Sequence, residues 1–309
     1  MDVDNQLPDH HATVHSAVVF GNFDGVHLGH RALLARLVAH AQDLSGPAIA
    51  ITFDPHPLAV LRPDRTPLAV EPLDARLRKL RDQGVDRTFV LCFNAAFAAQ
   101  SANWFASTVL RDLLGARAIT VGPDTRFGHG GGGDVDLLRR VMAKSLGIVD
   151  IFAGVELDGQ LVSSSRVRAA VQAGDVALAA RLLDRPFALR GTVVHGDARG
   201  RLIGFPTANL QPENQVIPGR GVYACRAAID GVKHNAVVNI GTRPTFDGHS
   251  LRIEAHILDF QGDLYGRHLE LTFIARLRAE QRFDGVPALV AQLTSDVAAA
   301  RALLAEASS

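Results

Sequence analysis

The sequence is poor in features that mark several large classes of protein. It contains only two cysteines in 309 residues, Cys92 and Cys225, so nothing indicates a disulfide scaffold or a thiolate metal site. Both lie in apolar, strand-like runs, and we expect them to be buried free thiols. No apolar run reaches the roughly 18 residues of a membrane span. The start of the chain is polar and acidic, unlike a signal or transit peptide.

The chain also lacks an excess of charge of either sign. Lysine plus arginine and aspartate plus glutamate each number 32. A generic binder of nucleic acid or of a membrane surface would carry a basic excess, so we expect neither partner. We therefore expect a cytoplasmic protein, a monomer or weak homo-oligomer, whose partners are small molecules.

What the sequence does contain, from residue 16 to about 185, is a regular alternation of apolar strands and helices. The strand-like runs are "SAVVFGNF", "PAIAITF", "RTFVLCF", "ARAITVG" and "IVDIFAGV". Short continuous apolar strands between capped helices predict a doubly wound parallel α/β sheet, which binds ligands at the carboxyl ends of its strands. The glycine run "GHGGGG", residues 128–133, predicts a mobile loop.

After Pro186 the pattern changes to strands joined by turn-rich segments, among them the hairpin signal Asp230-Gly231. Five or six strands in about 100 residues predict a small antiparallel β-barrel. An amphipathic helix from about Pro287 to Glu306 closes the chain. We expect an α/β domain over residues 1–185 and a barrel domain with a terminal helix over residues 186–309.

Two histidines, His27 and His30, stand at the junction of the first strand and its helix. A metal site, a phosphate site and two surface histidines are the alternatives. A zinc pair on a helix is usually spaced by four residues with a glutamate beside it, and this pair is spaced by three without one. Gly21, Gly25 and Gly29 permit a ligand to approach the backbone. Helix N–H groups favour an anion, so local chemistry favours phosphate.

Two further segments lie where the predicted fold places ligands. "SSSRVR", residues 163–168, begins a helix with three hydroxyls and two arginines. A plain serine N-cap with exposed arginines explains that segment equally well. "TFDPHP", residues 52–57, follows the second strand, and its prolines indicate a rigid turn.

The stretch from His27 to His30 resembles the HxGH motif of the nucleotidylyltransferase superfamily. "GNFDGVHLGH", "TFDPHP", "VGPDTRFG" and "SSSRVR", in this order, resemble the FMN adenylyltransferase module of bacterial FAD synthetases. The sequence departs from that pattern at Thr125, where an aromatic residue is usual, and at the glycine run, which lacks the usual basic residues. Ser165 replaces the common threonine and keeps the hydroxyl.

The second half carries its own polar constellation. In "GFPTANL", residues 204–210, Thr207 and Asn209 offer oxygen ligands suited to Mg²⁺ with phosphates, although a hydrogen-bonded polar turn is the alternative. In "LRIEAHILDF" the apolar residues alternate with Arg252, Glu254 and His256. Glu254 is therefore either on a solvated face or directed into a cleft, where it could accept the proton of an attacking alcohol.

"GRLIGFPTANL", "GVYACRAAI", "NIGTRPTF", "IEAHILDF" and "LRAEQRF" resemble, in order, the riboflavin kinase module. Together the two resemblances cover roughly residues 16–306 and imply a bifunctional FAD synthetase of the prokaryotic type. The resemblance implies that riboflavin, FMN and ATP are substrates and that Mg²⁺ is the cofactor. There are two rival interpretations. One is a flavin-binding protein without catalysis, and the other is a different adenylyltransferase fused to an unrelated barrel.

The expected site residues follow from these resemblances. The expected catalytic residues are His27, His30, Ser164, Ser165, Arg168 and Glu254. The expected nucleotide-binding residues are Gly21, Asn22, Asp24, Gly29, Gly204, Thr207 and Asn209, with Thr207 and Asn209 also holding the metal. Asp124 and Arg278 are expected to contact the flavin.

Overall fold

The computed structural model describes residues 2–196, 199–245 and 248–306, and the chain divides into two compact units. The first comprises residues 1–68 and 73–163, and the second residues 69–72 and 164–309. Residues 164–185 thus group with the second unit by their contacts. The boundary between functional domains expected at residues 185 and 186 stays a prediction.

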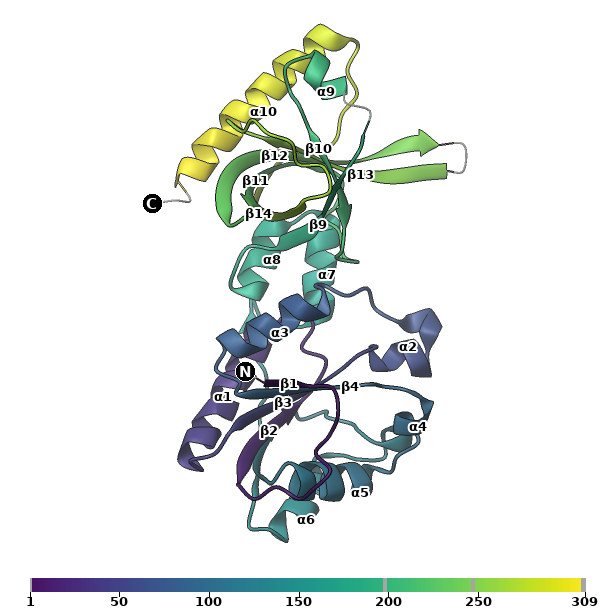
Figure 1. Cartoon of the computed structure of the whole chain (residues 1–309), viewed down its shortest axis with the longest axis vertical. Coiled ribbons are helices and arrows are strands. Elements are labelled where there is room, and N and C mark those ends of the chain that lie inside the picture. The colour runs from purple at the N-terminus through teal and green to yellow at the C-terminus, as the bar shows by residue number, and fades with distance from the viewer. Residues whose placement is uncertain (1, 197–198, 246–247, 307–309) are drawn as a thin grey trace. The chain divides into compact units, whose positions relative to one another are not determined.

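The first unit is a six-stranded parallel sheet with helices on both faces (Figure 1), in the strand order β1-β4-β3-β2-β5-β6. Its strands are β1 (Asp2–Asp4), β2 (Ser16–Phe20), β3 (Ala48–Phe53), β4 (Arg87–Leu91), β5 (Ala116–Val121) and β6 (Ile148–Ile151). Its helices are α1 (Leu28–Asp43), α2 (Pro57–Leu61), α3 (Leu73–Asp82), α4 (Ala95–Ala98), α5 (Ala102–Trp104) and α6 (Val135–Ala143). A π-helical segment, Phe105–Leu113, continues α5, and β7 (Glu156–Leu157) and β8 (Gln160–Leu161) form a small hairpin. The predicted doubly wound sheet is confirmed.

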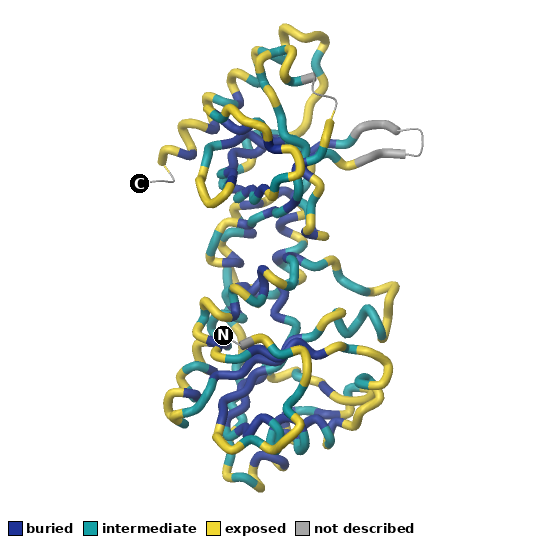
Figure 2. The backbone as a smooth tube through the Cα atoms, viewed as in Figure 1, coloured by how far each residue is buried: buried dark blue, intermediate teal, exposed yellow. Residues whose placement is uncertain are grey.

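The central strands β2 to β5 are largely apolar and buried because helices cover both of their faces (Figure 2). On β2, Ala17 and Val19 pack with Leu34 of α1 and with α3, whereas Val18 packs with Phe105 and the opposite helices. The chain builds β3 and β4 on one side of β2 and then returns to build β5 on the other. The carboxyl ends of β2 and β5 therefore flank the point where strand order reverses, which is the usual ligand crevice.

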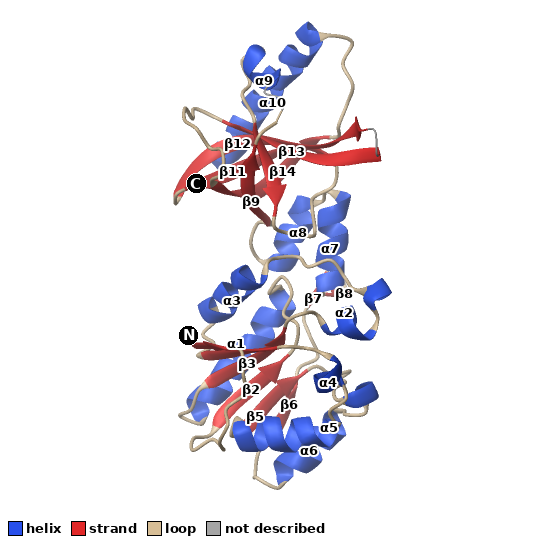
Figure 3. Ribbon diagram, turned by 45° about the vertical axis from the view of Figure 1, so that its right-hand side comes forward, coloured by secondary structure: helices blue, strands red, loops and turns tan. Residues whose placement is uncertain are grey.

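The second unit holds a closed six-stranded barrel, seen in Figure 3, with the strand order β10-β13-β12-β11-β14-β9. Its strands are β9 (Ala188–Val194), β10 (Ala208–Pro212), β11 (Gly221–Ile229), β12 (Val232–Thr245), β13 (Gly248–Ile257) and β14 (His268–Arg278). Its helices are α7 (Ser164–Ala173), α8 (Val176–Leu183), α9 (Arg199–Leu202) and α10 (Val286–Glu306). Asp230 and Gly231 form the predicted two-residue hairpin loop with φ angles of 48° and 83°. Phe246, the end of "NIGTRPTF", lies outside the described residues.

Helix α10 packs across the barrel, where its Ala300 and Leu304 meet Val222 and Ala224 of β11. By length and composition alone this 21-residue helix is apolar enough to cross a membrane. The expectation that no apolar segment is as long as a membrane span is therefore wrong. Isolated charges such as Asp296 interrupt the apolar run, but the helix as a whole stays apolar.

The two cysteines have different surroundings. Cys225 is buried in β11, and burial raises the pKa of its thiol well above the ordinary value, as expected for an inert side chain. Cys92 is exposed, so its expected burial is wrong: it lies one residue beyond the end of β4, where the helices no longer cover the strand.

The glycine run contains more local structure than its composition indicates. His129–Gly131 forms a short 3₁₀ turn, and Phe127 pairs with Gly133. A Cβ atom on Gly133 would lie 2.6 Å from the Phe127 ring and 2.7 Å from Cβ of Ala102, so glycine is required there by close packing. The predicted mobility of this loop stays a prediction.

Candidate functional site

The loop between β2 and α1 assembles the residues expected around the histidine pair. His27 is the N-cap of α1, and its Nδ1 accepts a hydrogen bond of 3.3 Å from the backbone N–H of His30. The two imidazole rings stack with their centroids 3.7 Å apart. Because Nδ1 of His27 accepts a hydrogen bond, the neutral ring carries its proton on Nε2. The histidines therefore lie at the positive end of a helix, as the sequence predicts.

His30 is held in its neutral form. Burial, then the neighbouring His27 and then Arg76 lower the pKa of His30 well below its ordinary value. Its Nδ1 is buried and has no hydrogen-bond partner among the described residues. A neutral imidazole beside a helix N-terminus can donate a hydrogen bond to an anion and gain charge as negative charge develops.

The backbone of this loop is tightly constrained. A Cβ atom on Gly29 would lie 3.2 Å from Cε1 of His27, so only glycine leaves that ring in place without crowding. Phe23 and Val26 adopt positive φ angles of 49° and 36°, which are strained for residues with a side chain. Both side chains are buried, and their burial holds the loop in this conformation.

The "TFDPHP" segment contacts the same loop. The Thr52 hydroxyl donates to the backbone oxygen of Asn22 over 3.2 Å, and the Asn22 amide nitrogen lies 2.9 Å from Nε2 of His56. Gly21 donates its N–H to the backbone of β3 at Ile51, and Asp24 is buried within the loop. The structure thus brings together Gly21, Asn22, Asp24, His27, Gly29 and His30 as predicted.

An aromatic pocket that the sequence did not reveal lies near the same sheet edge. Its volume is about 200 Å³. Its lining includes Phe20, Phe53, Phe93, Phe97, Trp104, Phe105 and Phe127. These residues are scattered over more than 100 positions, and the one signal in the sequence is the 15 phenylalanines beside two tyrosines and one tryptophan.

The loop after β5 leads into this pocket. Asp124 is exposed and Thr125 is half-buried, and Arg126 and Phe127 that follow them line the pocket. The aromatic side chains of this pocket come from other segments, and Thr125 is not among its lining residues.

The expected serines and arginine lie together at the start of α7. Nη1 of Arg168 donates to the Ser165 hydroxyl over 3.3 Å, and Ser164 is the first residue of the helix. This helix belongs to the second unit, so the approach of Ser164, Ser165 and Arg168 to the histidine pair stays a prediction.

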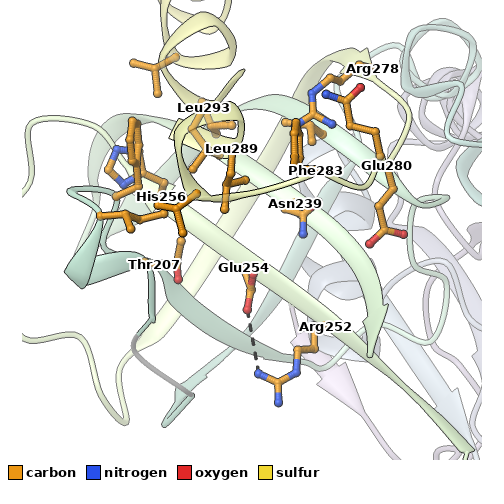
Figure 4. Close-up of a pocket in the computed structure, with 18 of the residues that line it drawn as sticks. Thr207, Asn239, Arg252, Glu254, His256, Arg278, Glu280, Phe283, Leu289 and Leu293 are labelled. Carbon is orange, nitrogen blue, oxygen red and sulfur yellow. Dashed lines mark ion pairs between the residues drawn. The ribbon is translucent and has the colours of Figure 1, made fainter. Parts of the chain in front are cut away.

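Strand register creates a polar row inside the barrel pocket. Asn209 of β10 pairs with Glu254 of β13, and Glu254 pairs with Asn239 of β12. All three side chains line a pocket of about 630 Å³ beneath α10 (Figure 4). The expected alternation of β13 is confirmed for Ile253, Ala255 and Ile257, which are buried, whereas Leu251 is exposed.

The pocket has one polar and one apolar side. Nη1 of Arg252 lies 4.0 Å from Oε1 of Glu254, and Thr207 and His256 also line the pocket (Figure 4). Leu289 and Leu293 of α10 supply apolar surface. Asn239 belongs to the quoted "NIGTRPTF" segment, yet only the pairing of β12 with β13 places it beside Glu254.

The loop before β10 positions Thr207. His256 Nδ1 lies 2.8 Å from the backbone oxygen of Pro206, and the Phe205 ring meets the His256 ring edge-on. Gly204 adopts a φ of 86° with open space around it. Thr207 also lines a second pocket of about 560 Å³, which extends to Tyr265.

Arg278 lines the larger pocket, but its guanidinium is already engaged. It donates to both carboxylate oxygens of Asp296 on α10 over 2.8–3.1 Å, and Asp296 is 3% exposed. Arg278 thus joins β14 to α10 and forms the pocket wall, and its contact with a flavin stays a prediction.

Comparisons with known proteins agree with both halves of the chain. Residues 9–166 match the FAD synthetase family profile, and residues 183–304 match the riboflavin kinase profile. The chain is 42% identical over 302 residues to the bifunctional riboflavin kinase/FMN adenylyltransferase of Pseudomonas fluorescens, covering 97% of this chain and 96% of that protein. The Bacillus subtilis protein of the same name is 35% identical, with 91% and 90% covered.

A solved structure from Streptococcus pneumoniae, described as a macrolide-efflux protein, is also similar. It is 34% identical, with a TM-score of 0.88 and coverage of 97% of this chain and 98% of that one. The family profiles and the curated relatives show that the chain belongs to the bifunctional riboflavin kinase/FMN adenylyltransferase family, which phosphorylates riboflavin to FMN and adenylylates FMN to FAD.

Proposed function

We propose that riboflavin is phosphorylated in the pocket beneath α10, with Glu254 as the general base. The observation that carries this proposal is the row of Asn209, Glu254 and Asn239 along the pocket. A carboxylate at this position can accept the proton of the ribityl hydroxyl, while the apolar surface of α10 suits the flavin ring. Arg278 contributes to the flavin-binding wall.

We propose that ATP occupies the neighbouring pocket, because Thr207 lines both cavities. Gly204 leaves open space beside that loop for the phosphates. The Thr207 hydroxyl and the Asn209 amide are hard oxygen donors next to a carboxylate, which fits Mg²⁺ held chiefly by phosphates. Mg²⁺ bound there would neutralise the charge of the transferring phosphoryl group.

In the proposed kinase step the ribityl oxygen forms a bond to the γ-phosphorus of ATP. The bond from that phosphorus to the β–γ bridging oxygen breaks, and ADP leaves. Glu254 takes the proton of the hydroxyl. Arg252, 4.0 Å from Oε1 of Glu254, is placed to orient the carboxylate for the transfer.

The adenylyltransferase step is proposed to occur at the histidine pair. A phosphate oxygen of FMN attacks the α-phosphorus of ATP, and pyrophosphate leaves. The attacking oxygen is already ionised, so the site needs charge stabilisation rather than a strong base. His27, His30 and the N-terminus of α1 supply it, with Ser164, Ser165 and Arg168 as further donors. The backbone at Gly21, Asn22, Asp24 and Gly29 shapes the nucleotide pocket.

The aromatic pocket is the proposed site of the FMN ring in this step. Phe20 lies at the carboxyl end of β2, directly before the histidine loop, so a ring stacked there would leave its phosphate near the histidines. Aromatic side chains offer stacking surface to a flat heterocycle. Asp124, in the loop leading to this pocket, is the proposed polar contact.

Separate loss of each activity tests these assignments. Glu254→Gln should lower the rate of FMN formation by roughly 10²- to 10⁴-fold and leave adenylylation of supplied FMN unchanged. His30→Asn should do the reverse. Chromatography of products from riboflavin, ATP and Mg²⁺ measures both. Loss of both activities in either folded variant would disprove the assignment of two separate sites.

The remaining proposals concern the chain as a whole. We propose that residues 1–185 serve adenylylation and residues 186–309 serve phosphorylation. The balanced charge of the sequence supports a cytoplasmic enzyme that is a monomer or weak homo-oligomer and binds neither nucleic acid nor membranes.

A further inference from the structure

A buried arginine next to the histidine loop has no counter-charge among the described residues. Arg76 of α3 is 9% exposed, and no carboxylate in the described part of the chain lies within ion-pairing distance of it. Its Nε is buried without a hydrogen-bond partner. Its one hydrogen bond to the described residues runs from Nη1 to the Thr52 hydroxyl and is long, at 3.4 Å.

An unpaired buried guanidinium is costly because it cannot lose its proton and has left water without compensation. Two other buried charges have ion-pair partners: Asp296 is paired with Arg278, and Glu71 with Arg185. The missing partner of Arg76 is therefore expected to be an anion that arrives with a ligand.

The position of Arg76 shows where that anion would bind. Thr52 joins Arg76 to the backbone of Asn22 in the histidine loop. The charge of Arg76 is also felt at His30, whose pKa it helps to lower. Arg76 and His30 both lie on the face of the sheet covered by α1 and α3, whereas the aromatic pocket belongs to the opposite cluster.

We propose that Arg76 is a phosphate ligand of the adenylyltransferase site and binds the part of the ATP triphosphate that leaves as pyrophosphate. This inference rests on the proposed placement of that site at the histidine pair. The planar guanidinium offers two parallel donors to phosphate oxygens, and its charge stabilises the leaving group.

The reverse reaction isolates this contact from the kinase site. Pyrophosphate attacks the α-phosphorus of FAD, the bond to the FMN phosphate oxygen breaks, and FMN and ATP form. Arg76→Met should raise the KM for pyrophosphate roughly ten- to a hundredfold, as expected for one lost charge-assisted hydrogen bond. In the forward direction the KM for FMN should stay unchanged. Arg76→Lys, which keeps the charge, should restore part of the affinity.

Stability separates a ligand contact from a structural one. Because Arg76 has no carboxylate partner, Arg76→Met should leave the unliganded melting temperature unchanged or higher. Riboflavin kinase activity of the same protein should be unchanged. Arg78→Met on the exposed face of α3 is the matched control and should behave as wild type.

Three outcomes would overturn the inference: an unchanged KM for pyrophosphate, a rise in the KM for FMN alone, or a clear fall in the unliganded melting temperature. If Arg76→Met carries out pyrophosphorolysis normally while His30→Asn has lost adenylylation, only the role of Arg76 is rejected. Full adenylylation in His30→Asn would reject the proposed site itself.

Discussion

At the scale of single residues, the proposed adenylyltransferase site contains a neutral histidine and an uncompensated arginine. His30 is kept neutral, and Arg76 is buried without a carboxylate. The buried Nδ1 of His30 and Nε of Arg76 are left without hydrogen-bond partners among the described residues of the unliganded protein, and the proposed binding of a polyanion would relieve this. Functional sites commonly hold such perturbed groups, because the ligand supplies the missing interaction.

The titration of His30 tests this at one atom. Burial and the neighbouring cations disfavour the imidazolium, so the ring should stay neutral well below the ordinary histidine pKa of about 6.5. A folded-state pKa below the unfolded value means that the unfolded chain binds more protons. The stability that His30 contributes is therefore complete above a pH of about 6.5. It is lost as the pH falls from there through the lower folded-state pKa of His30.

NMR of the imidazole C2 protons, assigned by comparison with His30→Asn, measures this pKa. Addition of an ATP analogue should raise it, because a phosphate favours the charged ring. A His30 resonance that titrates near 6.5 in the unliganded protein would contradict the structural account.

Gly29 gives a second test at residue scale. Gly29→Ala should lower adenylyltransferase kcat by roughly ten- to a hundredfold. The new methyl group would lie 3.2 Å from Cε1 of His27 and would push that ring out of place. Alanine is a good helix former, so stability should not suffer from propensity. Steady-state rates report the effect, and riboflavin kinase activity serves as the control. Equal losses in both activities would point to misfolding instead.

At the scale of elements, α10 is joined to the barrel by one buried ion pair as well as by apolar contacts. Arg278 of β14 and Asp296 of α10 meet through three hydrogen bonds at the edge of the proposed riboflavin kinase pocket. The helix also contributes Leu289 and Leu293 to the lining. Its attachment therefore determines the shape of the pocket.

Removal of one partner should be more harmful than removal of both. Asp296→Ala should lower the stability of the barrel by about 3 kcal/mol, because it leaves the Arg278 guanidinium without its partner. The KM for riboflavin should rise as the pocket wall loosens. The double variant Arg278→Met/Asp296→Leu should recover most of the stability.

Calorimetry measures both variants. The one tryptophan, Trp104, lies in the first unit, so its fluorescence reports the unfolding of that unit. The unfolding transition that calorimetry detects and Trp104 fluorescence does not is therefore that of the barrel. Equal destabilisation by the single and double variants would show that the ion pair itself, rather than an orphaned charge, dominates.

At the scale of the whole molecule, we propose that each of the two activities is carried by a different fold. The barrel pocket draws its lining from residues of one unit, and the histidine loop and aromatic pocket belong to the other. FMN is the product of the first reaction and the substrate of the second.

Complementation between variants tests this organisation. Glu254→Gln and His30→Asn should each fail to make FAD from riboflavin, yet an equimolar mixture should make it, because FMN released by one protein can be used by the other. FAD should appear after a lag that shortens when FMN is added. A mixture that forms FMN but no FAD would contradict exchange of FMN through solution.

The amino-acid sequence by itself determined the fold classes, the order of the principal elements and most chemistry-bearing positions. Apolar runs, the Asp230-Gly231 turn and the HLGH stretch are local patterns, and local patterns act through propensity, periodicity and backbone freedom. Hence the parallel sheet, the barrel, the terminal helix and the histidines at the mouth of α1 were all predictable. Strand β1, with three residues, was too short to show such a pattern.

Only the tertiary structure decided which distant residues meet. Strand register places Asn239 beside Glu254, the sheet edge gathers phenylalanines from separate segments, and α3 brings Arg76 to the histidine loop. Composition does not reveal that Arg76 is buried without a counter-charge or that Cys92 is exposed. Burial and pairing depend on contacts between segments far apart in the chain, and those contacts are a property of the packed fold.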